Sequence, residues 1–386
     1  MTRKNYLLSS ESVSEGHPDK MADQISDAVL DAHLSQDPSA RIACETLLAK
    51  KLVVVAGEIS SEAEVDIPDI VRKTIKDIGY TTQADGFDYR TCEIITSISG
   101  QSGHIKKGVK LPNGEVGAGD QGMMFGYATD EATELMPLGI SLAHKLMQKQ
   151  AELRKNGSLK WLRPDAKSQV TVRYEGTKPI AVEKIVFSTQ HSQDVNVDQI
   201  RDGIIGEVIE RTVPQELRAK DIKYFVNPTG SFEIGGPQAD TGLTGRKIIV
   251  DTYGGSCPHG GGAFSGKDPT KVDRSAAYMA RYIAKNIVAA GLSKRCTVQL
   301  AYAIGVSEPV SLMIDLQGGG NVDEKKLEDA VRQIFSLSAG GIIEMLDLYR
   351  PIYQKTSVYG HFGREIPEFT WEKTDKINAL RDILNI

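Results

Sequence analysis

The pattern of hydrophobic and polar positions repeats three times along the chain. Each copy begins with two short runs rich in β-branched and aromatic residues, which indicate a hairpin, and continues with a Val-Asp pair followed by apolar residues at helical spacing. The hairpin runs span 44–59, 170–188 and 298–314, and the Val-Asp pairs begin at 65, 197 and 322. A further helical pattern precedes each copy, at 22–34, 131–155 and 269–290. The pattern predicts three units, each with a helix, a hairpin and a second helix.

These units favour an α+β fold with three similar domains, each a mainly antiparallel sheet with helices on one face. A regular alternation of strands and helices, typical of a doubly wound parallel sheet, is missing, so that architecture is the second choice. A chance match of three generic hairpin-and-helix patterns remains the alternative, because a two-residue marker is short.

Composition narrows the class of protein. A chain of 386 residues exceeds what one hydrophobic core usually organises, so two or three domains are expected. With 40% hydrophobic residues, 25% charged residues and a net charge of -5, nothing in the balance favours nucleic acid or an anionic membrane as a partner. No apolar run approaches the roughly 18 residues of a membrane span, and we expect a cytoplasmic protein. Four cysteines without a Cys-x-x-Cys pair argue against a zinc ribbon or a disulfide framework.

A glycine-dense tract at 253–268 runs into the third helical pattern. Glycines leave backbone N–H groups accessible, and a helix N-terminus favours anions, so the tract predicts a polyphosphate site; a plain flexible loop is the alternative. Gly261 to Lys267 fits the spacing of a P-loop, but Asp268 stands where that motif needs Ser or Thr. We expect Asp268 to cap a helix that starts at Pro269 and places Lys271 and Asp273 in its first turn, where Asp273 could hold magnesium.

A second polar loop, 12–20, also breaks into a helix at a proline. It carries His17 and Asp19, which could reach a phosphate and a hard cation together. Aspartates recur every four residues from Asp19 to Asp31, and such acidic stripes usually face solvent, so only Asp19 is assigned to the site. Polar clusters at 117–122, 163–167, 235–240 and 245–247 could add cations if they converge, and the glycine-punctuated stretch 100–119 is typical of a lid. Motifs of serine hydrolases, zinc proteases and protein kinases are absent from the sequence.

Taken together, the motifs at 16–20 (GHPDK), 117–122 (GAGDQG), 242–247 (GLTGRK) and 260–268 (GGGAFSGKD) strongly resemble those of the S-adenosylmethionine synthetase (methionine adenosyltransferase) family, over essentially the whole chain. The resemblance implies three α+β domains with internal pseudo-threefold symmetry. It implies attack of the sulfur of L-methionine on C5′ of ATP, followed by hydrolysis of the triphosphate to phosphate and diphosphate, a step of one-carbon metabolism. It also implies Mg2+, two ions per site, together with K+.

The resemblance assigns roles to individual residues. The catalytic residues would be His17, Lys167, Arg246 and Lys267; further ATP contacts would come from Asp165, Phe232, Asp240, Lys247 and Ala263; methionine contacts from Glu58, Gln101, Asp240 and Lys271; and a further pocket contact from Asp120. Asp19 and Asp273 match the magnesium ligands, and Glu45 matches the potassium ligand. Ser231 and Ala239 depart from the residues common at their positions in the family, and Ser231 receives no side-chain role.

The expected organisation is a domain at 3–101, an active-site loop at 102–119, domains at 120–233 and 234–372, and a tail at 373–386. The family also implies a homodimer with shared active sites, often paired into a tetramer, so His17 and Lys267 could serve one site from different chains. Two other classes are weighed against this interpretation: a P-loop phosphohydrolase or phosphotransferase, which Asp268 disfavours, and a catalytically silent nucleotide-binding protein, which the presence of His17, Asp19, Lys267 and Asp273 disfavours.

Overall fold

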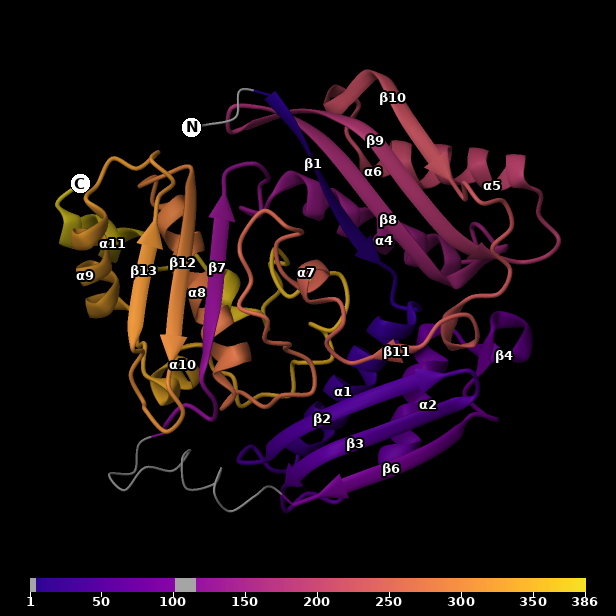
Figure 1. Ribbon diagram of the computed structural model, residues 1–386, viewed down its shortest axis with the longest axis horizontal. Coiled ribbons are helices and arrows are strands. Elements are labelled where there is room, and N and C mark those ends of the chain that lie inside the picture. The colour runs from indigo at the N-terminus through magenta and orange to yellow at the C-terminus, as the bar shows by residue number, and fades with distance from the viewer. Residues whose placement is uncertain (1–4, 101–115) are drawn as a thin grey trace.

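The computed structural model describes residues 5–100 and 116–386 (Figure 1). Within these ranges the strands form three larger sheets and a two-stranded ribbon. In spatial order the strands are β11 (Gly242–Leu243), β2 (Arg41–Ala49), β3 (Leu52–Ser60) and β6 (Glu93–Ser99) in the first sheet; β1 (Asn5–Val13), β8 (Leu162–Glu175), β9 (Lys178–His191) and β10 (Arg218–Val226) in the second; β13 (Ser311–Asp315), β12 (Arg295–Tyr302) and β7 (Gly122–Thr129) in the third; and β4 (Thr81–Thr82) with β5 (Phe87–Asp88) in the ribbon.

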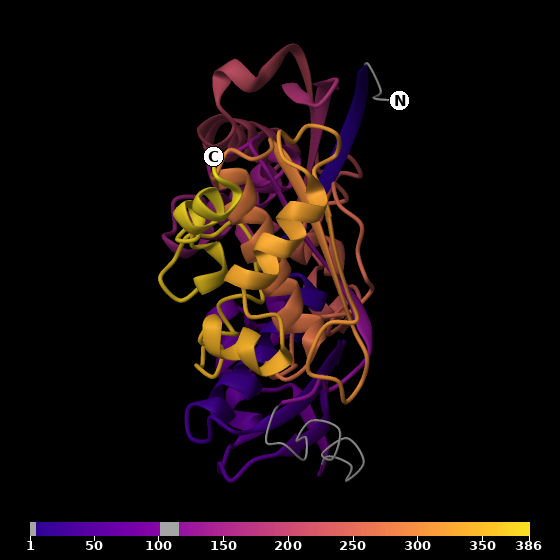
Figure 2. The same ribbon diagram turned by 90° about the vertical axis from the view of Figure 1, so that its left-hand side faces the viewer.

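The helices lie on one side of the molecule and the three sheets on the other (Figures 1 and 2). They are α1 (Pro18–Leu34), α2 (Ile67–Ile78), α4 (Leu138–Lys155), α5 (Val197–Gly203), α6 (Glu210–Thr212), α7 (Ile248–Asp251), α8 (Val272–Ala289), α9 (Glu324–Ile334), α10 (Ala339–Met345) and α11 (Ile377–Leu384), with a π-helical stretch at Ile204–Ile209 and short 3-10 turns at Gln83–Asp85, Gln215–Leu217, Gly236–Gln238 and Thr370–Glu372. The described helices include none with the length and hydropathy needed to span a bilayer.

The repeated hairpin-and-helix units are confirmed. The pairs β2–β3, β8–β9 and β12–β13 are antiparallel hairpins. The helix that follows each hairpin starts after a side-chain cap, and in each case the capping oxygen accepts a hydrogen bond from the N–H three residues later. The caps are Asp66, Asn196 and Asp323. The predicted α+β class is also confirmed, although β6 joins β3 and β10 joins β9 in parallel.

Each larger sheet takes one edge strand from a different third of the chain. The first strand, β1, pairs with β8 of the second sheet; β7 pairs with β12 of the third; and β11 pairs with β2 of the first. The exchange is cyclic and ties the three sheets together through main-chain hydrogen bonds. The domain limits expected from the sequence divide the chain into consecutive segments, and they stay a prediction.

Two helices begin later than the sequence predicts. The stretch from Glu131 was predicted to be helical, but α4 starts at Leu138, because Pro137 precedes it and the Glu131 carboxylate instead accepts the Leu138 N–H at 3.1 Å. The predicted helix start at Pro269 is also wrong, since α8 begins at Val272 with Lys271 at its N-cap.

In the acidic stripe of α1, Asp19, Asp23 and Asp27 are buried and Asp31 is half-buried, contrary to the expectation that the stripe faces solvent. Its carboxylates accept backbone N–H groups from the C-terminal third of the chain. The pairs are Asp19 with Leu243 (3.0 Å), Asp23 with Gly245 (2.9 Å), Asp27 with Gly266 (2.8 Å) and Asp31 with Tyr353 (2.9 Å). Helix α1 therefore helps to connect the first sheet to the C-terminal third, and the apolar residues of these two regions form one continuous core, separate from the core beneath the second sheet.

One ion pair in this interface is fully buried. Both oxygens of Asp27 accept hydrogen bonds from the Arg274 guanidinium, at 2.7 and 2.9 Å, and both side chains have 0% exposure. Arg274 also donates to Thr356 Oγ1 at 2.9 Å and lies 4.2 Å from the centre of the Tyr353 ring. Removal of one partner leaves an uncompensated charge in a medium of low polarity.

We therefore predict that Arg274→Met lowers the free energy of unfolding by about 3–5 kcal/mol, measured by urea denaturation. The double variant Asp27→Asn/Arg274→Met should be less destabilised than Arg274→Met alone, because it removes the orphaned charge while the amide oxygen of the new side chain can still accept the Gly266 N–H. Equal or larger destabilisation of the double variant would contradict the assigned role of the charge.

Candidate active site

His17 caps the N-terminus of α1, and Pro18 occupies the first helical position. The Nδ1 atom of His17 accepts the Asp19 N–H at 3.2 Å, so the neutral ring carries its proton on Nε2. Burial, followed by the charges of Lys247 and Lys167, lowers the pKa of His17 to about 3, and the nearby Asp19 opposes this shift only in part. His17 is thus a neutral hydrogen-bond donor at physiological pH.

Cations from distant segments surround this helix end. Lys247 donates to Asp19 Oδ2 at 2.5 Å, and an Arg246 Nη atom lies 3.6 Å from Asp19 Oδ1. Lys167 lies on β8 opposite Val13, the last residue of β1. Burial opposes ionisation of Asp19, but the hydrogen bonds from Lys247 and Leu243 outweigh it, so the pKa of Asp19 lies below its ordinary value. We call His17, Asp19, Lys167, Arg246 and Lys247 the α1 cluster.

Two further predicted residues, Asp165 and Phe232, are each held by a hydrogen bond that involves a backbone N–H. Asp165, two residues before Lys167 on β8, accepts the Gly236 N–H through Oδ2 at 2.9 Å, while its Oδ1 has no partner among the described residues. Burial raises the pKa of Asp165 to about 6, against the opposing effects of Gly236 and Lys167. Phe232 is fixed through its backbone, because its N–H donates to His191 Nε2 at 2.9 Å. Sequence reasoning missed His191, since no motif surrounds it.

The glycine tract returns to the first sheet and places Lys267 beside β2. Lys267 forms a β-bridge with Ala43, and its Nζ donates to Asp273 Oδ2 at 2.6 Å. A glycine is required at 266, where φ is +79° and a Cβ atom would lie 1.8 Å from the Cys44 carbonyl oxygen. Asp273 lies in the first turn of α8, as expected for a carboxylate at a helix N-terminus. We call Lys267, Asp273 and Lys271 the α8 cluster.

Asp268 is not the helix cap that the sequence predicted. It is fully buried, and it accepts hydrogen bonds from the Thr270 N–H at 2.9 Å and the Ile42 N–H at 2.6 Å. It also forms an ion pair with Lys271, which stands at the N-cap rather than in the first turn. Asp268 therefore joins the glycine tract to β2. The Ser or Thr that a P-loop has at this position is uncharged and could not form the ion pair with Lys271.

The remaining predicted residues are dispersed around the α8 cluster and the Gly235–Leu243 segment. Glu45 and Glu58 are exposed on neighbouring strands of the first sheet, and since Glu58 pairs with Ala43 the two carboxylates share one face. Ala263 is half-buried in the glycine tract, whereas Asp120, just before β7, and Asp240 are exposed. Gln101, predicted to contact methionine, and most of the predicted lid lie outside the described residues.

The structure thus assembles two clusters, each at the N-terminus of a long buried helix. No hydrogen bond or ion pair within the described ranges joins the α1 cluster to the α8 cluster. Each cluster combines cations, a carboxylate and a helix dipole, which is an arrangement suited to a polyanion with a bound divalent cation.

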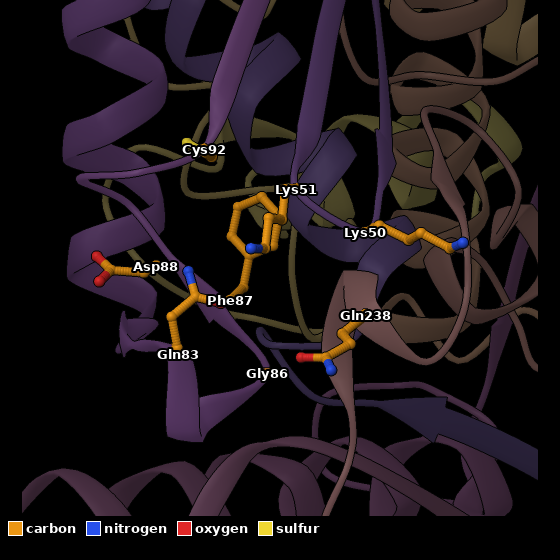
Figure 3. Close-up of a pocket in the computed structure, with 8 residues that line it drawn as sticks. All are labelled: Lys50, Lys51, Gln83, Gly86, Phe87, Asp88, Cys92 and Gln238. Carbon is orange, nitrogen blue, oxygen red and sulfur yellow. The ribbon is translucent and has the colours of Figure 1, made fainter.

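A cavity of about 700 Å³ is lined by residues that belong to neither cluster (Figure 3). The ring of Phe87 and the side chains of Lys50, Lys51 and Gln238 line it. Gln238, one of the residues that line the cavity, ends the Gly236–Gln238 turn and lies two residues before Asp240, which was predicted to bind both substrates.

The fold and the two clusters describe a three-sheet α+β protein suited to a polyphosphate. Family models for the N-terminal, central and C-terminal domains of S-adenosylmethionine synthetase match residues 5–103, 115–232 and 234–373. The S-adenosylmethionine synthases of Wolinella succinogenes and Helicobacter hepaticus are each 58% identical to the chain over 384 residues, which cover 100% of both sequences in each comparison. The chain belongs to the S-adenosylmethionine synthetase family.

We predict that Lys247→Met raises the pKa of His17, because the positive charge of Lys247 is, after burial, the largest contribution that lowers it. The ring resonances of labelled histidine, followed by NMR as a function of pH and assigned with His17→Gln, would report the change. Lys178→Met, at the tip of the β8–β9 hairpin, is the control and should leave the titration as it is. A His17 pKa that is unchanged or lowered in Lys247→Met would contradict the assignment.

Proposed function

We propose that the chain synthesises S-adenosylmethionine from ATP, L-methionine and water and releases phosphate and diphosphate. Family membership over the whole chain supports this reaction. The observation that carries it at the level of residues is the neutral, buried His17 between Lys167 and Lys247 at the N-terminus of α1.

The reaction makes particular demands on the site. The thioether sulfur of methionine carries no proton, so its attack on C5′ needs no general base. The barrier is lowered instead by alignment of sulfur and carbon and by stabilisation of the charge on the departing triphosphate. In this proposal His17 donates its Nε2–H to the leaving oxygen, and Lys167, Arg246, Lys247 and Lys267 hold the phosphates.

Further contacts follow the same proposal. Asp165, whose Oδ1 has no partner among the described residues, lines the nucleoside part of the pocket together with Phe232, Ala263 and Asp120, and Asp240 contacts both substrates. Glu58, Gln101 and Lys271 bind methionine. The subsequent hydrolysis of triphosphate uses the same cations, because the bound triphosphate remains in the α1 and α8 clusters.

The carboxylates of both clusters fit magnesium. Mg2+ in phosphoryl sites is usually held by one or two carboxylates, several waters and the substrate phosphates. Asp19 and Asp273 each supply one ionic carboxylate that now pairs with a lysine, Lys247 or Lys267, whose ammonium group would move to the phosphates. Two Mg2+ ions would neutralise phosphate charge, and Glu45, exposed beside Glu58, is the proposed K+ ligand.

The product mixture tests the reaction. Purified protein with ATP, Mg2+ and K+ should form a sulfonium adenosyl product only when L-methionine is added, as detected by mass spectrometry. Formation of ADP and phosphate alone would favour the phosphohydrolase class instead, and turnover no higher than background would favour a silent nucleotide-binding protein.

Lys267→Ala should lower kcat by about 10²–10³-fold, the usual cost of one preorganised donor to a developing charge. Its fold should persist, because Lys267 is partly exposed and its backbone makes the β-bridge with Ala43. Steady-state kinetics and thermal unfolding check the two statements, with Lys178→Ala as the exposed-lysine control. An unchanged kcat in folded Lys267→Ala would remove this residue from the mechanism.

We further propose that the protein is a homodimer, that two such dimers pair into a tetramer, and that each site combines the α1 cluster of one protomer with the α8 cluster of its partner. Large apolar side chains are exposed on strands of all three sheets, namely Leu7, Ile95, Met123, Phe225 and Met313. The sheets occupy one side of the protein, which no described helix covers (Figure 2). Because large exposed apolar patches mark interaction surfaces, this side of the sheets is the proposed subunit interface.

The domain limits and the cytoplasmic location expected from the sequence also remain predictions.

Subunit mixing tests the shared site. His17→Ala and Lys267→Ala should each be nearly inactive alone, but when unfolded together and refolded as a mixture they should recover activity. A mixed dimer would hold one site with both native residues and one with neither, so random pairing should restore about a quarter of wild-type activity. Recovery near zero, with mixed dimers present on native mass spectrometry, would show that one chain supplies both residues.

A further inference from the structure

We propose that Tyr80 is a positioning residue for His17. Its hydroxyl fixes the Gly16–His17 peptide relative to the loop at Gly236, whose N–H binds Asp165. The proposal deepens the function proposed above and rests on it. No sequence motif contains Tyr80, which follows the last helical turn of α2.

The ring of Tyr80 is fixed by the first third of the chain. Gly79 caps the C-terminus of α2 in the left-handed region, with φ of +111°, and the Tyr80 N–H donates to the Ile75 carbonyl at 3.2 Å. The Tyr80 side chain has 0% exposure, and its ring meets Phe87 edge to face at 6.3 Å between centroids. Phe87 is itself a wall of the neighbouring cavity (Figure 3). The hydroxyl is therefore presented from a rigid base.

The hydroxyl reaches the loop that ends in His17. Tyr80 Oη donates to the Gly16 carbonyl oxygen at 2.7 Å. The Gly16 carbonyl and the His17 nitrogen belong to the same peptide group. The hydrogen bond therefore restrains the orientation of that peptide plane, and with it the position of the His17 side chain at the N-cap of α1. Gly16 also packs closely against the next segment, because a Cβ atom there would lie 2.4 Å from Pro164.

The same hydroxyl borders the segment on the other side. A Cβ atom on Gly236 would lie 2.4 Å from Tyr80 Oη, and Gly236 has a φ of +62°. The Gly236 N–H donates to Asp165 Oδ2 at 2.9 Å. Tyr80 thus fills the space between the Gly16 and Gly236 loops, and the position of its oxygen sets their separation.

The remainder of the His17 loop is held from a different direction. The Glu15 carboxylate pairs with Arg154 and with Lys155, and Gln24 donates to the Glu15 carbonyl at 2.7 Å. These bonds anchor the loop before Gly16. Among the described residues the Tyr80 hydroxyl is the only side-chain donor to the Gly16 carbonyl. The N–H of the same peptide donates to the Ser14 carbonyl at 3.2 Å, so removal of the hydroxyl leaves the loop attached and the Gly16–His17 peptide held by one hydrogen bond in place of two.

Tyr80→Phe tests the proposal, because it keeps the ring and removes only the donor. We expect kcat for S-adenosylmethionine formation to fall by about 10- to 100-fold, the range that a small misplacement of a reacting group costs. The KM values for ATP and methionine should stay within about twofold, since the phosphate contacts of the lysines are unaffected.

Tyr302→Phe is the matched control. The Tyr302 hydroxyl is buried and donates to the Leu337 carbonyl at 2.6 Å, the same kind of bond in the third sheet, outside both clusters. It should lower the thermal midpoint about as much as Tyr80→Phe while leaving kcat within about twofold. An equal loss of kcat in both variants would assign the effect of Tyr80→Phe to general stability and overturn the proposal.

A double-mutant cycle decides whether Tyr80 acts through His17. In a His17→Ala background, Tyr80→Phe should change the residual kcat by less than about twofold, because the group it positions is gone. A full additional loss in that background, or an unchanged kcat in Tyr80→Phe itself, would overturn the proposal.

The NMR resonances of the His17 ring, recorded at one pH, give a readout that needs no turnover. In Tyr80→Phe a displaced or broadened His17 resonance supports positioning, and a resonance identical to that of the wild-type protein refutes it. Absence of the sulfonium product from the wild-type protein would instead refute the proposed function, so the two failures are distinguishable.

Discussion

Helix α1 presents a row of carboxylates to the interior of the protein, and the C-terminal third of the chain is organised around it. Asp19, Asp23, Asp27 and Asp31 recur once per turn, and each accepts a backbone N–H from a segment more than 200 residues away. Buried carboxylates are costly unless their oxygens are satisfied, so this row fixes where those segments can lie. The glycine tract and the Leu243–Gly245 turn owe their positions to it.

This dependence joins folding to chemistry. The first carboxylate of the row, Asp19, is also the one that contacts Lys247 and Arg246, and the last turn of the glycine tract, bound through Asp27, carries Lys267. The same helix therefore supplies the interior contacts that hold the C-terminal third and the N-terminus that favours an anion. His17, at that N-terminus, stays neutral because burial and two lysines disfavour its charged form.

The sequence was sufficient for the three hairpins and the helices that follow them, because the apolar runs and the helical spacing after each Val-Asp pair are local signals. It could not show that β1, β7 and β11 cross to other sheets, since strand partners are set by contacts far apart in the chain. The prediction that the acidic stripe of α1 faces solvent was wrong. A spacing of four residues places the carboxylates on one face of the helix, but it does not show whether water or backbone N–H groups bind them. For the site, every residue of the two clusters had been named from the sequence, but Asp268 was misplaced because its partner Ile42 lies on β2, far away in the chain. Tyr80 and His191 gave no signal, since their roles come from the segments they touch.

The cyclic exchange of edge strands bears on how the protein is made. The first sheet lacks its edge partner until residues 242–243 have left the ribosome, and the second sheet holds a strand from the very start of the chain. The edge strands of the second and third sheets are made before the rest of those sheets, whereas the first sheet needs a strand that is made later. Folding of the N-terminal third therefore cannot finish before the C-terminal third has begun to emerge. A nascent chain that stops within the central third would expose an unpaired edge of β2, and unpaired edges are sites of aggregation.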